Sequence, residues 1–168
     1  MSIAVINHQT QWKVNEPAMR KLTEFFLLKA GKCRGIQWGE VSLVLVDDAG
    51  SRAINKAHLG HDYPTDVISF NFDPIPGDPV TGACGEIVVN LSQAHRLGRR
   101  YGGTAHELAL YIAHGCDHLA GEDDKTPAQR QRMRRRELRW IREEGGKGSG
   151  VRVQEEGVRL KERAKPPS

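Results

Sequence analysis

The apolar positions along this chain recur with two spacings, one typical of strands and one typical of helices. Runs rich in β-branched and other apolar residues favour extended structure, and they predict four strands at residues 3–7, 41–46, 67–72 and 84–91. Apolar side chains at helical spacing, with capping and stopping residues, predict five helices at residues 15–31, 49–58, 92–101, 105–120 and 126–144. Thr104, followed three residues later by Glu107, predicts a capping box at the start of the fourth helix.

The order of these elements indicates the fold class. Four strands interleaved with helices predict a single α/β (or α+β) domain over residues 1–145, with a mixed four-stranded sheet covered by helices and the fourth helix at its centre. Residues 73–83 hold several prolines and glycines and are expected to form a loop. Residues 146–168 are rich in glycine and charge and poor in large apolar groups, which predicts a disordered charged tail.

The composition is that of an ordinary globular protein. Of 168 residues, 38% are hydrophobic and 27% charged, so the chain can build a core without disulfides. No apolar run approaches the roughly 20 residues that span a bilayer, and the N-terminus lacks the features of a secretory signal, so no membrane association is expected. Three widely separated cysteines favour reduced thiols and a cytoplasmic location.

Positive charge is concentrated in the last predicted helix. The formal net charge of +4 says little by itself, but between residues 125 and 142 eight Lys and Arg residues are opposed only by Glu137. A surface of this kind attracts phosphate backbones and releases counterions on binding. A solvated helix face is the alternative interpretation.

A metal-binding pattern lies on the central helix. His114 and His118 are four residues apart, so both imidazoles project from one face and can share an ion. Gly121 tolerates the left-handed conformation that ends helices, which lets the chain turn back and bring Asp124 beneath the helix. Two nitrogens and one oxygen suit one zinc ion with a fourth position open for water. The alternatives are a purely structural zinc and two histidines satisfied by backbone or solvent.

Zinc proteases share part of this spacing. Their motif, H-E-x-x-H-x-x-G-x-x-H, places a glutamate directly after the first histidine, where it acts as the general base. This chain has Gly115 at that position. Peptide hydrolysis is therefore disfavoured.

The same stretch resembles the signature of the bacterial YbeY endoribonucleases, H-G-x-x-H-L-x-G-x-D-H. The resemblance extends upstream to Asn55 and to the run from Asp62 to Phe70, which is similar to the family's N…D-x-P-T-D-V-L-S-F segment. Further matches follow in the family's order over about residues 43–144. Those matching residues are Gly85, Glu86, Ile87, His114, Gly115, His118, Leu119, Gly121, Asp123, Met133 and Glu137.

Two positions depart from the family pattern. The family's third histidine is Asp124 here; aspartate is a competent zinc ligand, although its extra negative charge weakens activation of a bound water. The family also tends to carry an arginine a few residues after Asn55, thought to act at the scissile phosphate, and the corresponding residue here is Leu59. Another cation, such as an arginine of the last helix, would have to substitute for it.

The resemblance implies a zinc-dependent endoribonuclease that cuts single-stranded RNA. Its expected work is maturation of the 3′ end of 16S rRNA and ribosome quality control in the cytoplasm, in association with components of the small ribosomal subunit. His114, His118 and Asp124 would act through the bound metal. The alternative is a zinc-containing ribosome assembly factor that binds RNA with little or no cleavage.

Five further residues are candidates for supporting roles. Thr65 and Asp66 precede a strand near the expected cleft, where they either position RNA or water or simply cap a turn. Glu137 shares a helical stripe with apolar residues, where it either orients a metal-binding histidine or is solvated or ion-paired. Arg134 and Arg135, from the basic helix, are candidate RNA contacts.

Overall fold

The chain alternates between strands and helices from its first residues. A computed structural model describes residues 1–73, 75–145 and 153–155. The elements in chain order are β1 (Ser2–Asn7), β2 (Trp12–Val14), α1 (Glu16–Lys32), β3 (Trp38–Val46), α2 (Asp48–Leu59), β4 (Val67–Phe72), β5 (Ala83–Asn90), α3 (Leu91–Gly98), α4 (Thr104–Leu119), α5 (Pro127–Gly145) and β6 (Val153–Glu155).

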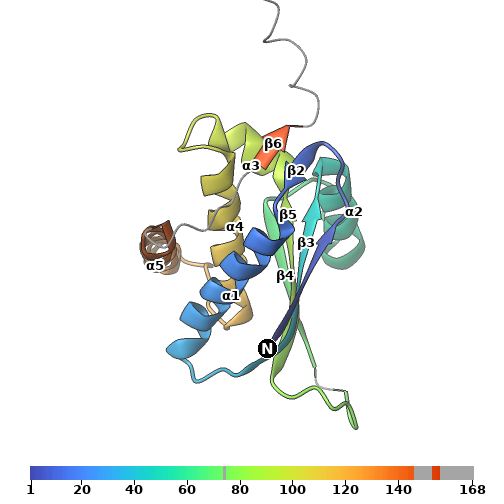
Figure 1. Cartoon of the computed structure of the whole chain (residues 1–168), viewed down its shortest axis with the longest axis vertical. Helices are drawn as coiled ribbons and strands as arrows, with labels where there is room; N and C mark the ends of the chain where they lie inside the picture. Colours follow the sequence, from blue (N-terminus) through green and yellow to red (C-terminus); the bar gives the residue numbers. More distant parts are fainter. Residues whose placement is uncertain (74, 146–152, 156–168) are drawn as a thin grey trace, which may run out of the picture.

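The main sheet has four strands in the order β1-β3-β5-β4. β1 and β5 run parallel to β3, and the edge strand β4 runs antiparallel to β5. Successive side chains of β3 point to opposite faces, so Leu43 and Leu45 enter the larger apolar core whereas Val44 and Val46 enter a smaller one. Figure 1 shows α1 and α4 on one face of this sheet and α2 on the other. The predicted single-domain α/β fold with a mixed sheet is confirmed.

α4 crosses the middle of the larger core, with α1, α3 and α5 beside it. Most of its residues are buried, and Gly115 packs directly against the sheet. A Cβ at Gly115 would lie 2.5 Å from Cγ2 of Ile87 on β5 and 3.2 Å from Oγ of Ser69 on β4. Glycine therefore lets the helix backbone rest directly on the two strands.

The capping box predicted at the start of α4 is wrong. The N-cap is Gly103, which has a φ of 101° and makes no side-chain cap, and Thr104 already lies inside the helix. The Thr104 hydroxyl lies 3.3 Å from Nδ1 of His95 instead, and Glu107 is buried. The close approach of α3 explains this arrangement, because a Cβ at Gly98 would sit 2.5 Å from the Gly103 carbonyl carbon.

A second, small sheet joins the two ends of the described chain. β2 pairs antiparallel with β6, with Trp12 opposite Glu155. Neither strand is predicted from the sequence, because three residues are too few for an apolar period to register. β6 falls inside the segment predicted to be a disordered tail and is a strand instead. The rest of that tail, 146–152 and 156–168, lies outside the described residues.

The helices are too short or too polar to cross a bilayer. Within the described ranges, no helix combines the length and the apolar character that a membrane span requires.

Candidate metal centre

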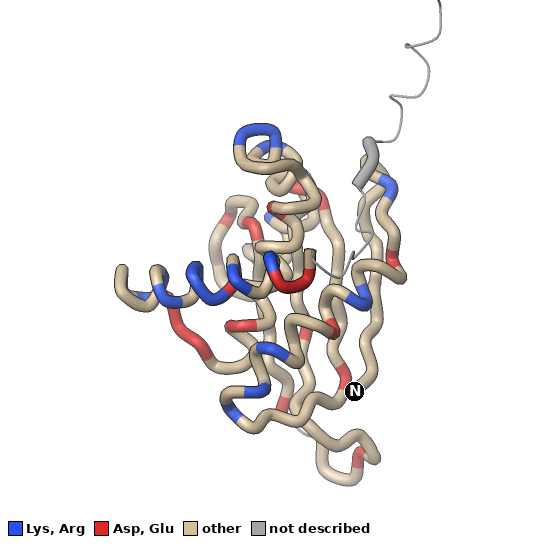
Figure 2. Tube along the Cα trace, turned by 60° about the vertical axis from the view of Figure 1, so that its left-hand side comes forward, with Lys and Arg blue, Asp and Glu red and all other residues tan. Residues whose placement is uncertain are grey.

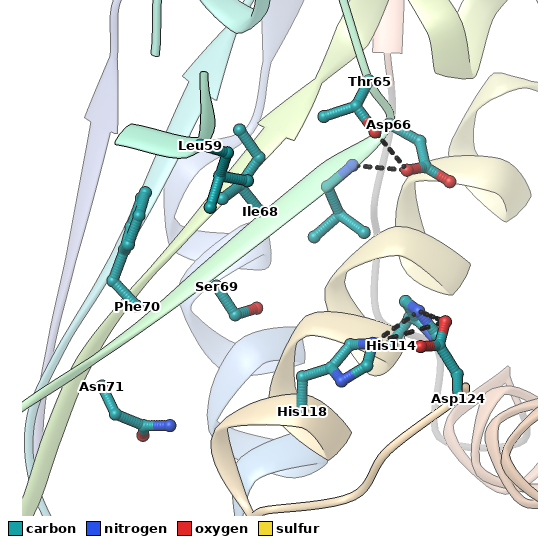
Figure 3. Close-up of a pocket in the computed structure, with 11 residues that line it drawn as sticks. Leu59, Thr65, Asp66, Ile68, Ser69, Phe70, Asn71, His114, His118 and Asp124 are labelled. Atoms are coloured by element: carbon teal, nitrogen blue, oxygen red, sulfur yellow. Dashed lines mark hydrogen bonds and ion pairs between the residues drawn. The ribbon is translucent and has the colours of Figure 1, made fainter. Parts of the chain in front are cut away.

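Three side chains predicted to bind metal meet at one point beside β4. His114 and His118 lie one turn apart on α4, and their Nε2 atoms are 2.9 Å from each other. Gly121, with a φ of 89°, ends the helix and reverses the chain, as expected for a left-handed residue at this position. Asp124 then returns so that its Oδ2 lies 3.7 Å from Nε2 of His114 and 3.8 Å from Nε2 of His118. Figure 3 shows the three side chains turned toward one another.

These separations suit a small tetrahedral ion. Ligand bonds of about 2.0–2.1 Å at tetrahedral angles separate neighbouring ligand atoms by about 3.3 Å. The three observed separations lie on both sides of that value. The group can therefore hold a metal ion after shifts of a few tenths of an ångström.

Hydrogen bonds to Nδ1 of each imidazole orient the ring so that Nε2 points toward the candidate site. Nδ1 of His114 lies 2.8 Å from Oε1 of Glu137, and Nδ1 of His118 lies 3.0 Å from the carbonyl oxygen of Glu122. A carboxylate and a carbonyl can only accept, so each Nδ1 donates and each neutral ring leaves Nε2 unprotonated. With both rings neutral, the two Nε2 lone pairs at 2.9 Å would repel each other, and either a proton on one Nε2 or a cation beside both removes this repulsion.

Glu137 reaches the site from the inner face of α5. The residue is 1% exposed, and its carboxylate contacts His114 23 residues away in sequence. Burial of an unpaired carboxylate would cost free energy of folding, and the hydrogen bond with His114 offsets that cost. Of the roles considered from the sequence, a solvated carboxylate is ruled out, and Glu137 instead contacts His114 directly, where it can both pair with the ring and orient it.

The charge around His114 favours its protonated form. Burial acts to lower its pKa, but the hydrogen bond and charge of Glu137, with the charges of Asp66 and Asp124, outweigh burial and raise the pKa above its ordinary value. The negative potential that favours a proton also favours a metal cation in the same place.

A buried ion pair holds the chain where it turns back after α4. Arg136 of α5 contacts Asp117 at 2.7 Å and Glu122 at 3.3 Å. Burial raises the pKa of Asp117 to about 6, although the Arg136 hydrogen bond acts to lower it. These residues fix Glu122, whose carbonyl orients His118. The sequence alone did not indicate a role for Arg136, Asp117 or Glu122, because the variable positions of a short motif do not reveal partners on another helix.

A cleft of about 500 Å³ opens from the metal centre along β4. Residues 67–71 of that strand line it, together with Thr65, Asp66, Leu59 and the three ligands. Asp66 accepts hydrogen bonds from the Val67 backbone at 2.8 Å and the Thr65 hydroxyl at 3.2 Å, so it stabilises a turn while also facing the cleft. None of the described residues that line this cleft is Lys or Arg.

Cations adjoin the metal centre from its other side. A second cavity of about 270 Å³ shares Asp66, His114 and Asp124 with the cleft and is lined in addition by Arg130 and Arg134 of α5. Arg130 also donates to the backbone carbonyl of Asp124 at 2.9 Å. Arg135, the other candidate arginine, is exposed and lines neither cavity.

Comparison with known proteins identifies the family of this chain. The model of the family described as Endoribonuclease YbeY matches residues 4–144. The chain belongs to the YbeY family. The family resemblance drawn from the sequence motifs is thereby confirmed.

Relatives with the name Endoribonuclease YbeY come from several bacteria. That of Elusimicrobium minutum is 40% identical over 129 residues, which cover 73% of this chain and 88% of the relative. That of an Anaeromyxobacter species is 39% identical over 67% of this chain and 58% of the relative, and that of Myxococcus xanthus is 37% identical over 68% and 40%. The match thus spans less than two thirds of the length of the latter two proteins.

A solved structure shares the fold. The solution structure of TM1509 from Thermotoga maritima matches with a TM-score of 0.55 at 23% identity, covering 88% of this chain and 95% of that one.

Proposed function

We propose that this protein is a zinc-dependent endoribonuclease that cleaves single-stranded RNA. The observation that carries the proposal is the convergence of His114, His118 and Asp124 at the end of an open cleft. The names of the relatives support RNA as the substrate. The donor set supports zinc, because two imidazole nitrogens and one carboxylate oxygen leave a fourth position for water, as in catalytic zinc sites.

The chain's own residues have distinct roles in this proposal. His114, His118 and Asp124 hold the ion, and Glu137 and the Glu122 carbonyl fix the two rings. Zinc bound there supplies a Lewis acid and lowers the pKa of a water molecule from about 15.7 toward 7. Asp66 faces both cavities, which suits it to accept a hydrogen bond from the attacking water, while Thr65 beside it contacts the RNA.

Arg134 is proposed to stabilise negative charge on the scissile phosphate. Cleavage of a phosphodiester builds charge on its oxygens, and positively charged side chains beside them lower the barrier. Leu59 stands where an arginine is common in the family, and the cleft has no Lys or Arg in the part of the chain that the structure describes. Arg134 lines the adjoining cavity beside His114, and is therefore placed to act from the opposite side. Arg130 holds the backbone of Asp124.

The biological substrate is proposed to be ribosomal RNA. Processing of the 3′ end of 16S rRNA and ribosome quality control would place the protein in the cytoplasm, with components of the small ribosomal subunit. The arginine-rich helix next to the site supports a polyanionic substrate of this kind. A zinc-containing assembly factor that binds RNA with little cleavage is the second candidate, and the aliphatic Leu59 at the cleft favours it.

A metalloprotease is disfavoured by packing as well as by sequence. A glutamate at position 115 would have to fit where even a Cβ lies 2.5 Å from Ile87. That space is filled by β5, so α4 cannot carry the protease general base at this position.

Cleavage of single-stranded RNA by the purified protein tests the proposal. We expect the wild type to cut, EDTA to abolish cutting, added zinc to restore it, and His114→Ala to be inactive with and without zinc. Tight binding of RNA without turnover by the wild type would select the assembly factor instead. Undiminished cutting by His114→Ala would remove the metal centre from the mechanism.

A further inference from the structure

α5 carries more positive charge than the metal centre uses. Successive residues of a helix advance by about 100° around its axis, so Arg132, Arg135, Arg139 and Arg142 fall within an arc of about 80°. We call these four residues the outer stripe. Figure 2 shows Lys and Arg recurring along this helix, which projects from the body of the molecule. All four are exposed, and among the described residues none of them makes an ion pair.

The outer stripe faces away from the rest of the protein. The buried residues of α5 are Met133, Glu137 and Trp140, which lie on the opposite side of the helix and pack toward α4 and α1. α5 has three acidic residues, Glu137, Glu143 and Glu144, and at 100° per residue none of them falls within the arc of the stripe. Glu137 is committed to His114, and Glu143 is ion-paired with Lys29 of α1. Among the described residues of α5, the arc of the stripe holds no acidic side chain, and Glu143, which borders it, is paired with Lys29.

We propose that the outer stripe binds the phosphate backbone of an RNA segment that flanks the linkage being cut. The choice of RNA as the partner rests on the function proposed above. The first and last of the four arginines are ten residues apart, or about 15 Å at a rise of 1.5 Å per residue. One strand of a nucleic acid duplex presents a phosphate about every 3.4 Å of axis, so roughly four phosphates match that length.

The chemistry of the stripe fits phosphate better than a protein surface. Protein interfaces have an apolar core, and none of the large apolar side chains that are exposed in the described ranges belongs to α5. All four cations are arginines, whose planar guanidinium groups form paired hydrogen bonds with phosphate oxygens.

The stripe is also connected to the metal centre through the same helix. Arg134 lines the cavity beside His114, and Arg135 follows it directly on the outer face. Because the helix is only about 10–12 Å across with its side chains, a strand that leaves the cavity past Arg134 reaches the stripe within a few nucleotides. The stripe thus acts on binding of longer substrates and not on the chemical step.

A double variant with a matched control separates these effects. The variant is Arg135→Gln with Arg139→Gln, and the control is Arg99→Gln with Arg100→Gln, which removes the same charge from exposed positions in the turn after α3. Fluorescence anisotropy in EDTA gives the Kd for single-stranded RNAs of about 20 and about 5 nucleotides, which bracket the usual lengths of single-strand binding sites. Circular dichroism and zinc content verify that both variants are folded.

We expect the stripe variant to bind the long RNA at least roughly tenfold more weakly than the control and the short RNA equally well. The slope of log K against log salt should fall by about 1.4, since each contact with a single strand contributes about 0.7. With zinc present, KM for long RNA should rise while kcat stays unchanged.

Equal affinity of variant and control for the long RNA would overturn the proposal. The stripe would then bind another kind of partner, such as an acidic protein. Failure of every form to bind RNA would overturn it as well. A wild type that binds RNA but never cuts would defeat the proposed nuclease activity only, because the comparison of Kd values would still decide the role of the stripe.

Discussion

At the scale of single residues, the proposed metal centre would depend on groups that do not contact the ion. Each imidazole is held by an acceptor behind it, Glu137 for His114 and the Glu122 carbonyl for His118. Such partners fix the tautomer and the orientation of the ring and raise its basicity as a ligand. The ligands can be chosen from sequence spacing, but these acceptors become visible only when helices pack.

Replacement of Glu137 by glutamine tests this dependence. Glutamine has the same shape and can still accept from Nδ1 of His114, but it lacks the negative charge. We expect the affinity for zinc to fall about 10–100-fold, as is usual when such a partner is altered. Competition with a chromophoric chelator measures it. Glu24→Gln, an exposed change on α1, serves as the control, and an affinity of Glu137→Gln equal to that control would contradict the role.

At the scale of elements, the site exists because α4 lies directly on the edge of the sheet. At Gly115 the backbone of α4 lies so close to β4 and β5 that there is no room for a side chain between them. The hydroxyl of Ser69 on β4 donates a hydrogen bond to the Gly115 carbonyl at 3.2 Å. The neighbouring residue His114 therefore lies at the wall of the cleft. The glycine has two consequences, close packing of the helix and exclusion of a general base from that position.

We expect Gly115→Ala to destabilise the fold by about 1–3 kcal/mol, the usual cost of overpacking a filled core. Ile87, whose Cγ2 would meet the new methyl group at 2.5 Å, is fully buried, so it can give way only by displacing other core side chains. Urea denaturation measures the change. Gly145→Ala is the matched control, because nothing lies within 4 Å of a Cβ at that position. If the two variants unfold at the same urea concentration, the proposed contact does not limit the packing.

At the scale of the whole molecule, the metal centre joins segments that are separate in the sequence. α4 supplies two of the proposed ligands, the turn after Gly121 supplies the third, and α5 supplies Glu137. The unfolded chain does not hold these groups together, so zinc should bind the folded state preferentially and stabilise it.

Removal of zinc should therefore lower the melting temperature. With free zinc at about 100 times its Kd, the expected stabilisation is about 2.7 kcal/mol, or roughly 5–10 °C for a domain of this size. EDTA should remove it. Asp124→Ala should bind less zinc by elemental analysis and show a smaller shift, whereas Asp78→Ala, an exposed change in the loop before β5, should behave like the wild type. Equal zinc content in wild type and Asp124→Ala would show that the third ligand is misassigned.

Local regularities of the sequence were enough to predict the main elements and the three side chains that meet at the candidate site. An apolar period of two residues marks buried strands, a helical period places His114 and His118 on one face, and Gly121 marks the turn that returns Asp124. Each of these depends on residues that are near one another in the chain, so each leaves a signal in the sequence.

Only the tertiary structure decided the remaining features, because they depend on contacts between distant segments. The approach of α3 replaced the expected capping box of α4 with Gly103, and the pairing of β2 with β6 formed strands too short to predict. The packing of α5 on α4 directed Glu137 to His114 and left the outer stripe facing solvent. A sequence pattern gives the spacing of side chains along one element. Which element packs against each face is determined only when the elements assemble around a common core.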